Sequence, residues 1–125
     1  MEKVIRVLVA NRPRLMRELI LSTFSDQPDV EIVAEVADES EIFAWVNKTL
    51  PTFVVIALDH PGRRPAICDE LLRAHPHVRV IAVAPEGQCI EYYWVSLDIQ
   101  SSEIEPSEEG ILSALRSATL TSPTN

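Results

Sequence analysis

Three short segments of the chain are almost continuously apolar and rich in β-branched residues. They are "VIRVLVA" at residues 4–10, "FVVIAL" at residues 53–58 and "VRVIAVA" at residues 78–84. Strands buried on both faces have this composition, and such strands occur in parallel sheets covered by helices on both sides. These segments constrain the fold most, because they predict three central strands of one sheet.

The segments between these strands have the spacing of amphipathic helices. Between residues 15 and 24, large apolar residues recur at helical spacing while arginine, glutamate and serine occupy the other side, which favours a helix with one buried face. Asp38 is followed three residues later by Glu41, as at the start of a capped helix. Pro65 fits the first turn of a third helix. The predicted helices cover about residues 14–24, 38–50, 65–75 and 106–118.

Two further segments have the pattern of strands with one exposed face. In "VEIVAEV", residues 30–36, apolar residues alternate with Glu31 and Glu35, which predicts an edge strand. The segment after residue 85 fits two patterns, because a helical stripe runs through residues 89–97 and a strand-like alternation through residues 95–99. We therefore expect a short helix near residues 86–94 and an edge strand near residues 95–100.

Strand and helix alternate five times in this order, which favours right-handed crossovers and helices on both faces of a parallel sheet. We predict an α/β fold of the flavodoxin-like type, a (βα)5 three-layer sandwich with a parallel five-stranded sheet of order 2-1-3-4-5. This order places both alternating strands at the edges. Ligands of such folds bind at the carboxyl ends of the first and third strands, which are here "ANRP" and "ALDHPG".

Composition limits the domain organisation and the partners. With 125 residues and 46% hydrophobic content, we expect one domain, 1–125, with a core of about residues 4–118 and a frayed tail at 119–125. The net charge of -8 repels phosphate backbones and anionic lipids. The apolar runs are too short for a membrane span, and the two cysteines lack CxxC spacing. We therefore expect a cytoplasmic protein without direct nucleic-acid or membrane contact.

Four segments of the chain resemble a known family. "IRVLVANRPRLMREL", "DVEIVAEVAD", "LPTFVVIALDHPG" and "HPHVRVIAVA" are similar to the corresponding segments of response-regulator receiver domains, especially those of LuxR/NarL-type transcription regulators. The likeness covers residues 4–84 well and the remainder loosely. It implies the CheY-like form of the fold and a role in two-component signal transduction.

The same resemblance assigns positions to the family's phosphorylation site. In the family, two acids after the first strand help to hold magnesium, and an aspartate at the end of the third strand accepts phosphate from a histidine kinase. Asn11 and Arg12 stand where the two acids would be, Ala57 stands at the acceptor position, and Ala84 replaces the hydroxyl residue that ends the fourth strand. The family's lysine after the fifth strand has no counterpart, because both lysines of the chain precede residue 50. The resemblance thus implies a degenerate pseudo-receiver with no catalytic residue, cofactor or bound magnesium.

Asp59 lies two residues beyond Ala57, in a loop. We do not expect it to substitute as the phosphate acceptor, because phosphorylation would still require a metal. We expect a solvated loop acid that pairs with Arg12 or Arg63. The three histidines occupy a loop and a helix exit, so we expect no metal site.

Two surface features each have two interpretations. Tyr92, Tyr93 and Trp94 form an aromatic cluster, which is either an anchor for a partner, because receivers pair through this region, or part of the core. The arginines near the start of the first helix either bind an acidic partner or form a solvated helix face; they are Arg12, Arg14 and Arg17.

Together these observations predict a phosphorylation-independent pseudo-receiver that is not an enzyme. It would act as a protein-interaction or dimerisation module in bacterial signal transduction or transcription regulation, with a protein partner or a second copy of itself. One alternative is a sensor that binds a small ligand in the vacated pocket near Arg12. Another is the receiver half of a longer DNA-binding response regulator.

Overall fold

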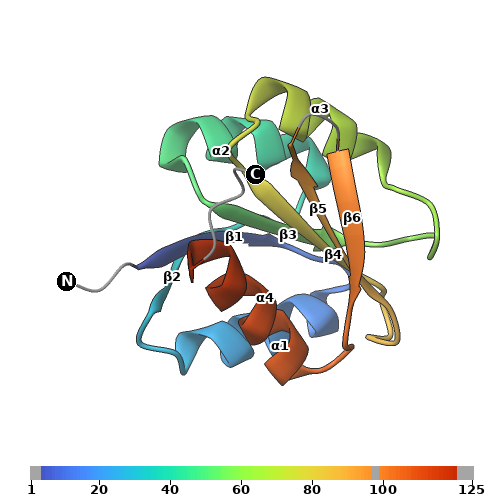
Figure 1. Ribbon diagram of the computed structural model, residues 1–125. Coiled ribbons are helices and arrows are strands. Elements are labelled where there is room, and N and C mark those ends of the chain that lie inside the picture. Colours follow the sequence, from blue (N-terminus) through green and yellow to red (C-terminus); the bar gives the residue numbers. More distant parts are fainter. Residues whose placement is uncertain (1–3, 97–98, 121–125) are drawn as a thin grey trace.

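The computed structural model describes residues 4–96 and 99–120. Its strands form one six-stranded sheet. Helices α2 and α3 cover one face of the sheet and α1 and α4 cover the other (Figure 1). The short 3-10 turn η1 leads into α2. The elements are β1 (Ile5–Ala10), α1 (Arg14–Ser25), β2 (Val30–Glu35), η1 (Glu39–Glu41), α2 (Ile42–Thr49), β3 (Phe53–Ala57), α3 (Ala66–Ala74), β4 (Arg79–Val83), β5 (Ile90–Val95), β6 (Ile99–Ile104) and α4 (Glu108–Leu120).

The three apolar segments form the parallel centre of the sheet, as the sequence predicts. The strand order is β2-β1-β3-β4-β5-β6, and β1 pairs in parallel with both β2 and β3 while β3 pairs in parallel with β4. Every residue of β3 is buried. Strand β2, whose residues are half-buried or exposed, lies at the predicted edge. The predicted parallel order of the first four strands is therefore confirmed.

The second half of the sheet differs from the prediction, because β5 and β6 are antiparallel. The expected helix near residues 86–94 is wrong: after β4 the chain turns back through Gly87, at φ +76°, and β5 pairs directly with β4. The residues of β5 alternate between the two faces, with Tyr92 on the α1/α4 side and Tyr93 on the α2/α3 side. Aromatic residues can bury on a sheet as well as on a helix, so the apolar stripe did not discriminate between them.

The expected edge strand near residues 95–100 is also wrong. Val95 ends β5 and Ile99 begins β6, so this segment spans a hairpin connection, of which Leu97 and Asp98 lie outside the described residues. The two strands pair in antiparallel register from Ile90 opposite Ile104 to Val95 opposite Ile99. The sheet therefore has six strands rather than five, and β6 rather than the fifth strand forms the edge.

Two apolar clusters, one on each face of the sheet, form the core. One contains Leu8, Val54 and Leu71 under α2 and α3, and the other contains Val7, Phe24 and Leu115 under α1 and α4. Because side chains alternate along each buried strand, β1, β3 and β4 contribute to both clusters. Within residues 4–96 and 99–120, no helix is long and apolar enough to cross a membrane.

Helix α4 confirms the predicted terminal helix and explains its glycine. A Cβ at Gly110 would lie 1.9 Å from the backbone oxygen of Glu105, so only glycine fits where the first turn of α4 meets the preceding loop. Farther along, Arg116 forms a forked pair with Asp29, with both nitrogen–oxygen distances at 3.0 Å. The hydrogen bond from this guanidinium lowers the pKa of the Asp29 carboxyl below its ordinary value. This pair ties α4 to the loop between α1 and β2.

Candidate functional site

The topology brings the predicted pocket residues together at the carboxyl ends of three neighbouring strands. Asn11 follows β1, Ala57 ends β3 and Ala84 follows β4. Since Ala10 is opposite Ile56 in the sheet, Asn11 lies next to the end of β3. This is where parallel α/β sheets carry their binding sites. The resemblance and the topology therefore point to one location.

Ala57 and Ala84 are almost completely buried, with exposed fractions of 6% and 1%. A methyl side chain has no lone pair to attack phosphorus and no proton to donate to a phosphate oxygen. These two positions therefore offer neither an acceptor nor a hydrogen-bond donor from their side chains.

Asn11 is fully buried and joins two strands. Its side-chain amide donates a hydrogen bond of 2.8 Å from Nδ2 to the backbone oxygen of Ile56. Its Oδ1 accepts no hydrogen bond from any residue that the structure describes. The amide therefore links the residue after β1 to the end of β3. A carboxylate at this position could not make that donation.

Arg12 forms the charged part of the candidate site. Its Nη2 lies 3.1 Å from Oδ2 of Asp59 and 3.4 Å from Oε1 of Glu39. The guanidinium thus joins the ends of β1 and β3 to η1. All three side chains are between 41% and 53% exposed, so each pair stabilises the fold by about 0–1 kcal/mol. The expected pairing of Asp59 with a nearby arginine is made by Arg12.

Arg17 contacts the backbone of the candidate site at Asn11. The sequence did not distinguish this role from that of Arg14. Only 11% of the Arg17 side chain is exposed; Nε contacts Glu35 at 3.0 Å and Nη1 donates a 3.2 Å hydrogen bond to the backbone oxygen of Asn11. Arg14 is 80% exposed and pairs with Glu18 on the same helix. The three arginines therefore do not form one basic patch, because each pairs with acidic side chains that the other two do not contact.

The aromatic cluster is divided between the two faces of β5. Tyr92 is buried beside Phe53 and Trp94, and its hydroxyl oxygen accepts a 2.9 Å hydrogen bond from Arg79. Tyr93 is buried on the opposite face, where its hydroxyl donates to Glu91. Trp94 keeps part of its surface accessible. Of the three proposed anchor residues, Trp94 is therefore the best placed to contact a partner.

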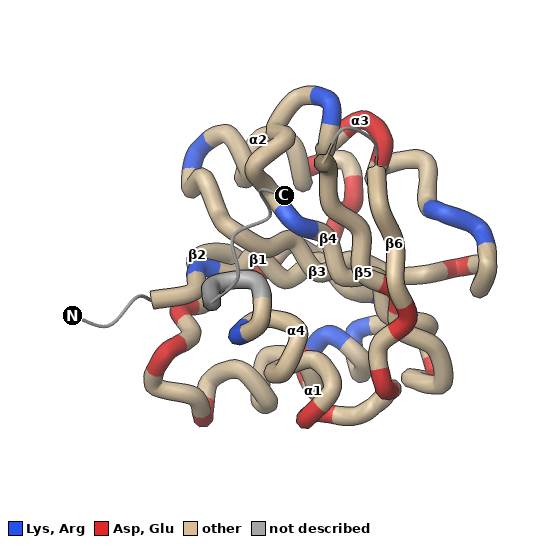
Figure 2. Tube along the Cα trace, viewed as in Figure 1, with Lys and Arg blue, Asp and Glu red and all other residues tan. Residues whose placement is uncertain are grey.

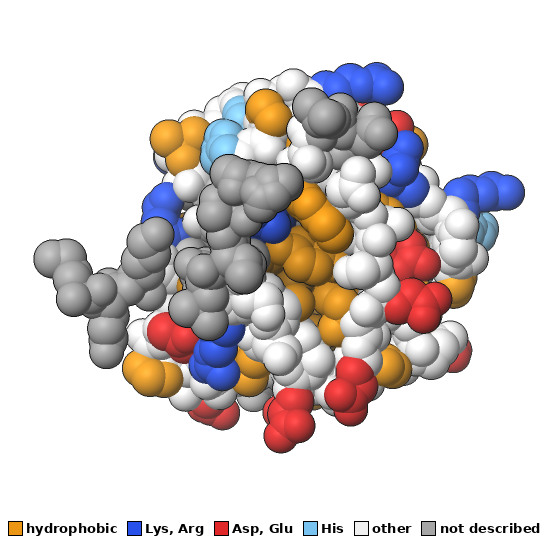
Figure 3. Space-filling view, in the orientation of Figure 1, with side chains coloured by type: hydrophobic (Ala, Val, Ile, Leu, Met, Phe, Trp, Pro, Cys, Tyr) orange, Lys and Arg blue, Asp and Glu red, His pale blue; other side chains and the backbone are white. Residues whose placement is uncertain are grey.

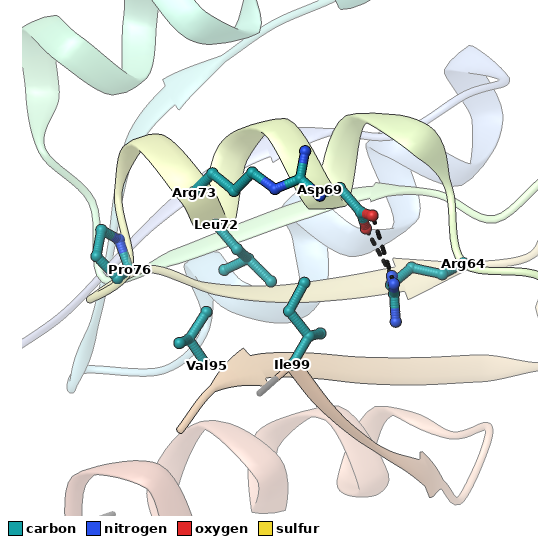
Figure 4. Close-up of a pocket in the computed structure, with 7 residues that line it drawn as sticks. All are labelled: Arg64, Asp69, Leu72, Arg73, Pro76, Val95 and Ile99. Carbon is teal, nitrogen blue, oxygen red and sulfur yellow. Dashed lines mark hydrogen bonds and ion pairs between the residues drawn. The ribbon is translucent and has the colours of Figure 1, made fainter. Parts of the chain in front are cut away.

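Sequence reasoning missed two adjoining pockets on the α3 side of the β5–β6 hairpin. One, of about 510 Å³, lies between α3 and the start of β6, where Leu72 points toward Val95 and Ile99 (Figure 4). Arg73 and the ion pair of Arg64 with Asp69, at 2.6 Å, form its rim.

The second pocket, of about 390 Å³, also contains Arg64 and extends between Glu91 and Glu103. Because Arg64 lines both pockets, we refer to the two together as the α3–hairpin groove. The prediction of a helix after β4 concealed this groove, because that helix would have covered the same face.

Neither the cysteines nor the acids form a reactive centre among the described residues. Burial raises the pKa of the Cys68 thiol to about 12, and partial desolvation together with Glu91 and Glu103 raises that of Cys89. A raised thiol pKa lowers the fraction of reactive thiolate at neutral pH. In residues 4–96 and 99–120, no three His, Cys, Asp or Glu side chains are grouped as metal ligands would be.

Comparison with known proteins supports the fold through structure rather than sequence. No protein-family model matches the chain, and no curated protein matches its sequence. Among solved structures, the isolated REC domain of RcsB from Salmonella enterica serovar Typhimurium, determined with the phosphomimetic BeF3-, superposes with a TM-score of 0.57 at 16% identity. This alignment covers 66% of the present chain and 62% of that domain.

Two further receiver structures are similar at 26% identity and a TM-score of 0.55. They are the response regulator domain of Thermotoga maritima CheB, with 66% of this chain and 61% of that chain covered, and the signal receiver domain of the putative response regulator NarL from Mycobacterium tuberculosis, with 67% and 68% covered. The chain thus has the CheY-like fold of response-regulator receiver domains.

Proposed function

We propose that this chain is a receiver-like module that works without aspartyl phosphorylation and acts by binding a protein partner or a second copy of itself in bacterial signalling or transcription control. It carries out no chemical reaction of its own in this proposal. The receiver fold of the three similar structures supports the signalling context. The composition of the candidate site supports independence from phosphate.

The arrangement of Arg12 is the observation that carries this proposal. A receiver needs a dication between carboxylates so that the negative charge of the transferred phosphoryl group is neutralised. Here the guanidinium of Arg12 contacts Asp59 and Glu39. A magnesium ion at the end of β1 would be repelled by this fixed positive charge and would meet an amide at Asn11 in place of a second acid.

Asp59 is a poor phosphate acceptor because its carboxylate is paired with Arg12. Its carboxylate is half-exposed and paired with Arg12 at 3.1 Å, and the side chains of Ala57 and Ala84 provide nothing to hold a phosphoryl group. Without a phosphorylated form, the protein has no phosphate-dependent difference in affinity between two states. Its regulation would then come from the concentration of the partner.

The alternative sensor has less support from the geometry. An anion that binds Arg12 would compete with two carboxylates that already contact the guanidinium. The alternative of a longer regulator agrees with the three similar structures, each of which is described as one domain of a named protein. In that case the module would bind partners while an additional domain provided the output.

Phosphate incorporation tests the proposal directly. The pure protein is incubated with acetyl phosphate and Mg²⁺, and intact-mass spectrometry measures any gain of one phosphoryl group. We expect no gain in the natural sequence and no change in the Asp59→Asn control. A stoichiometric gain that the Asp59→Asn variant loses would refute phosphate independence and identify Asp59 as the acceptor.

A further inference from the structure

Among the residues that the structure describes, none pairs with the outer backbone edge of strand β6. The backbone N–H of Ala84 donates to the oxygen of Cys89 at 2.9 Å, so these two residues form a hydrogen-bonded pair of the β4–β5 ladder. Hydrogen-bonding direction alternates along an antiparallel strand. The even-numbered residues of β5 therefore bond to β6, through their register partners Gln100, Ser102 and Ile104.

The remaining residues of β6 have their backbone groups directed away from β5. By this alternation they are Ile99, Ser101 and Glu103. No backbone hydrogen bond joins their outer edge to another described residue. Residues 100–103 of the strand are exposed and Ile99 is half-buried, so the outer edge offers three backbone donors and three acceptors along one line.

The opposite edge of the sheet is better protected than β6. Strand β2 carries Glu31 and Glu35, which pair with arginines of β1 and α1, and its register with β1 shifts after Val7. Charged side chains and such irregularities prevent a sheet edge from pairing with another strand. Strand β6 carries a single charged residue, Glu103, and pairs with β5 without a register shift. Strand β6 is therefore the sheet edge that is more accessible for pairing with a strand of another molecule.

We propose that β6 of one chain pairs antiparallel with β6 of a second copy, with Ser101 of both chains at the twofold axis. This inference specifies the partner of the proposed interaction module and rests on that proposed function. Outward-facing residues must oppose outward-facing residues in an antiparallel ladder. Centring the pair on Ser101 meets this condition and places Ile99 opposite Glu103 of the second copy.

The charges beside the β5–β6 hairpin favour this register. A twofold axis perpendicular to the sheet keeps the same face of both copies on the same side. Glu103 of the second copy then lies at the Ile99 end of the α3–hairpin groove, whose rim carries Arg64 and Arg73. At the axis itself, the small hydroxyl side chain of Ser101 faces its own copy and brings no like charge together.

The exposed position of the hairpin leaves room for a second copy. Figure 3 shows β6 as an outer ridge, with hydrophobic side chains gathered beside it on the side of α4. Figure 2 shows acidic residues near the end of β6 and the start of α4. These acids and the net charge of -8 oppose close approach of two copies. The dimer should therefore strengthen with rising salt, which screens charge beyond about 10 Å at 0.1 M.

Sedimentation equilibrium on the pure protein tests the pairing. We expect a dimer for the natural sequence and a weakening of at least about tenfold for Ser101→Lys, since two ammonium groups would meet at the axis. Ser101 is exposed, so the lysine should not disturb the monomer. The matched control is Ser22→Lys, which adds the same charge at an exposed position of α1. Mixing Ser101→Lys with Ser101→Glu should restore association.

Hydrogen exchange gives a second measurement that locates the interface. The amides of Ile99, Ser101 and Glu103 should become protected as protein concentration rises. A natural sequence that remains monomeric, or a dimer that Ser101→Lys leaves unchanged, would overturn the β6 pairing while leaving phosphate independence intact. Phosphate uptake by a dimeric protein would instead refute the proposed function and not the interface.

Discussion

Two arginines of α1 provide a controlled comparison between buried and exposed ion pairs. Arg17 and Arg14 each place Nε within 3.0 Å of a glutamate oxygen, but their side chains are 11% and 80% exposed. Arg17 also donates to the backbone oxygen of Asn11 at the candidate site. We predict that Arg17→Ala lowers the free energy of unfolding much more than Arg14→Ala does.

The magnitudes follow from the contacts. The hydrogen bond from a charged donor to the Asn11 oxygen contributes about 1.5–3 kcal/mol, and the pair with half-exposed Glu35 adds about 0–1 kcal/mol. The expected loss for Arg17→Ala is therefore about 1.5–4 kcal/mol. Arg14 and Glu18 form an exposed pair within one helix, so Arg14→Ala should lose only about 0.3–0.5 kcal/mol.

Urea unfolding followed by far-UV circular dichroism measures both losses. Equal m-values in the three proteins would show that the mutations change stability rather than the extent of unfolding. Arg17→Lys provides a further comparison, because an ammonium group retains the charge but not the fork that reaches two acceptors. Its stability should lie between those of the natural sequence and Arg17→Ala. Equal losses for Arg17→Ala and Arg14→Ala would refute the reasoning from burial.

Three further predictions concern packing, thiol reactivity and pH. Gly110→Ala should destabilise the fold by about 1–3 kcal/mol in urea unfolding, because the new methyl group overlaps a backbone oxygen. Iodoacetamide should label Cys89 in the folded protein and Cys68 only after unfolding; equal labelling would contradict the burial of Cys68. The Asp29 carboxyl has a folded pKa below its unfolded value of 3.8, so the stability lost in Arg116→Met should be full at pH 7 and should shrink as pH falls below about 4. If the stability difference between the natural sequence and Arg116→Met did not change with pH, the Asp29–Arg116 pair would not be its cause.

The sequence was sufficient for the parallel half of the sheet, because its signals there were unambiguous. Strands β1, β3 and β4 are buried on both faces and have continuous apolar sequences, while alternating glutamates marked β2 as an edge. The hairpin was not predictable in the same way. A run such as "IEYYWV" fits a buried strand or a helical stripe, and the direction of β5 depends on the tight turn at Gly87 rather than on the run itself.

The candidate site and the pairing of Asp59 with an arginine could be predicted from sequence, but the other contacts of the site could not. The resemblance indicated that Asn11 and Arg12 replace two acids, and the topology brings them to the expected end of the sheet. The pairing of Arg12 with Glu39 joins residues far apart in sequence, and no local pattern signals such a contact. The hydrogen bond from Arg17 to the Asn11 backbone was missed because spacing on a helix does not reveal which arginine is buried.

Binding of magnesium and beryllofluoride is the most direct test of a receiver scaffold without a phosphate switch. Amide resonances of the protein labelled with nitrogen-15 are recorded before and after addition of Mg²⁺ and BeF3-, a phosphomimetic. We predict that the resonances of Asn11, Ala57 and Ala84 stay in place at saturating concentrations of both. Saturable shifts centred on these three residues would show a working acceptor site and would contradict the account.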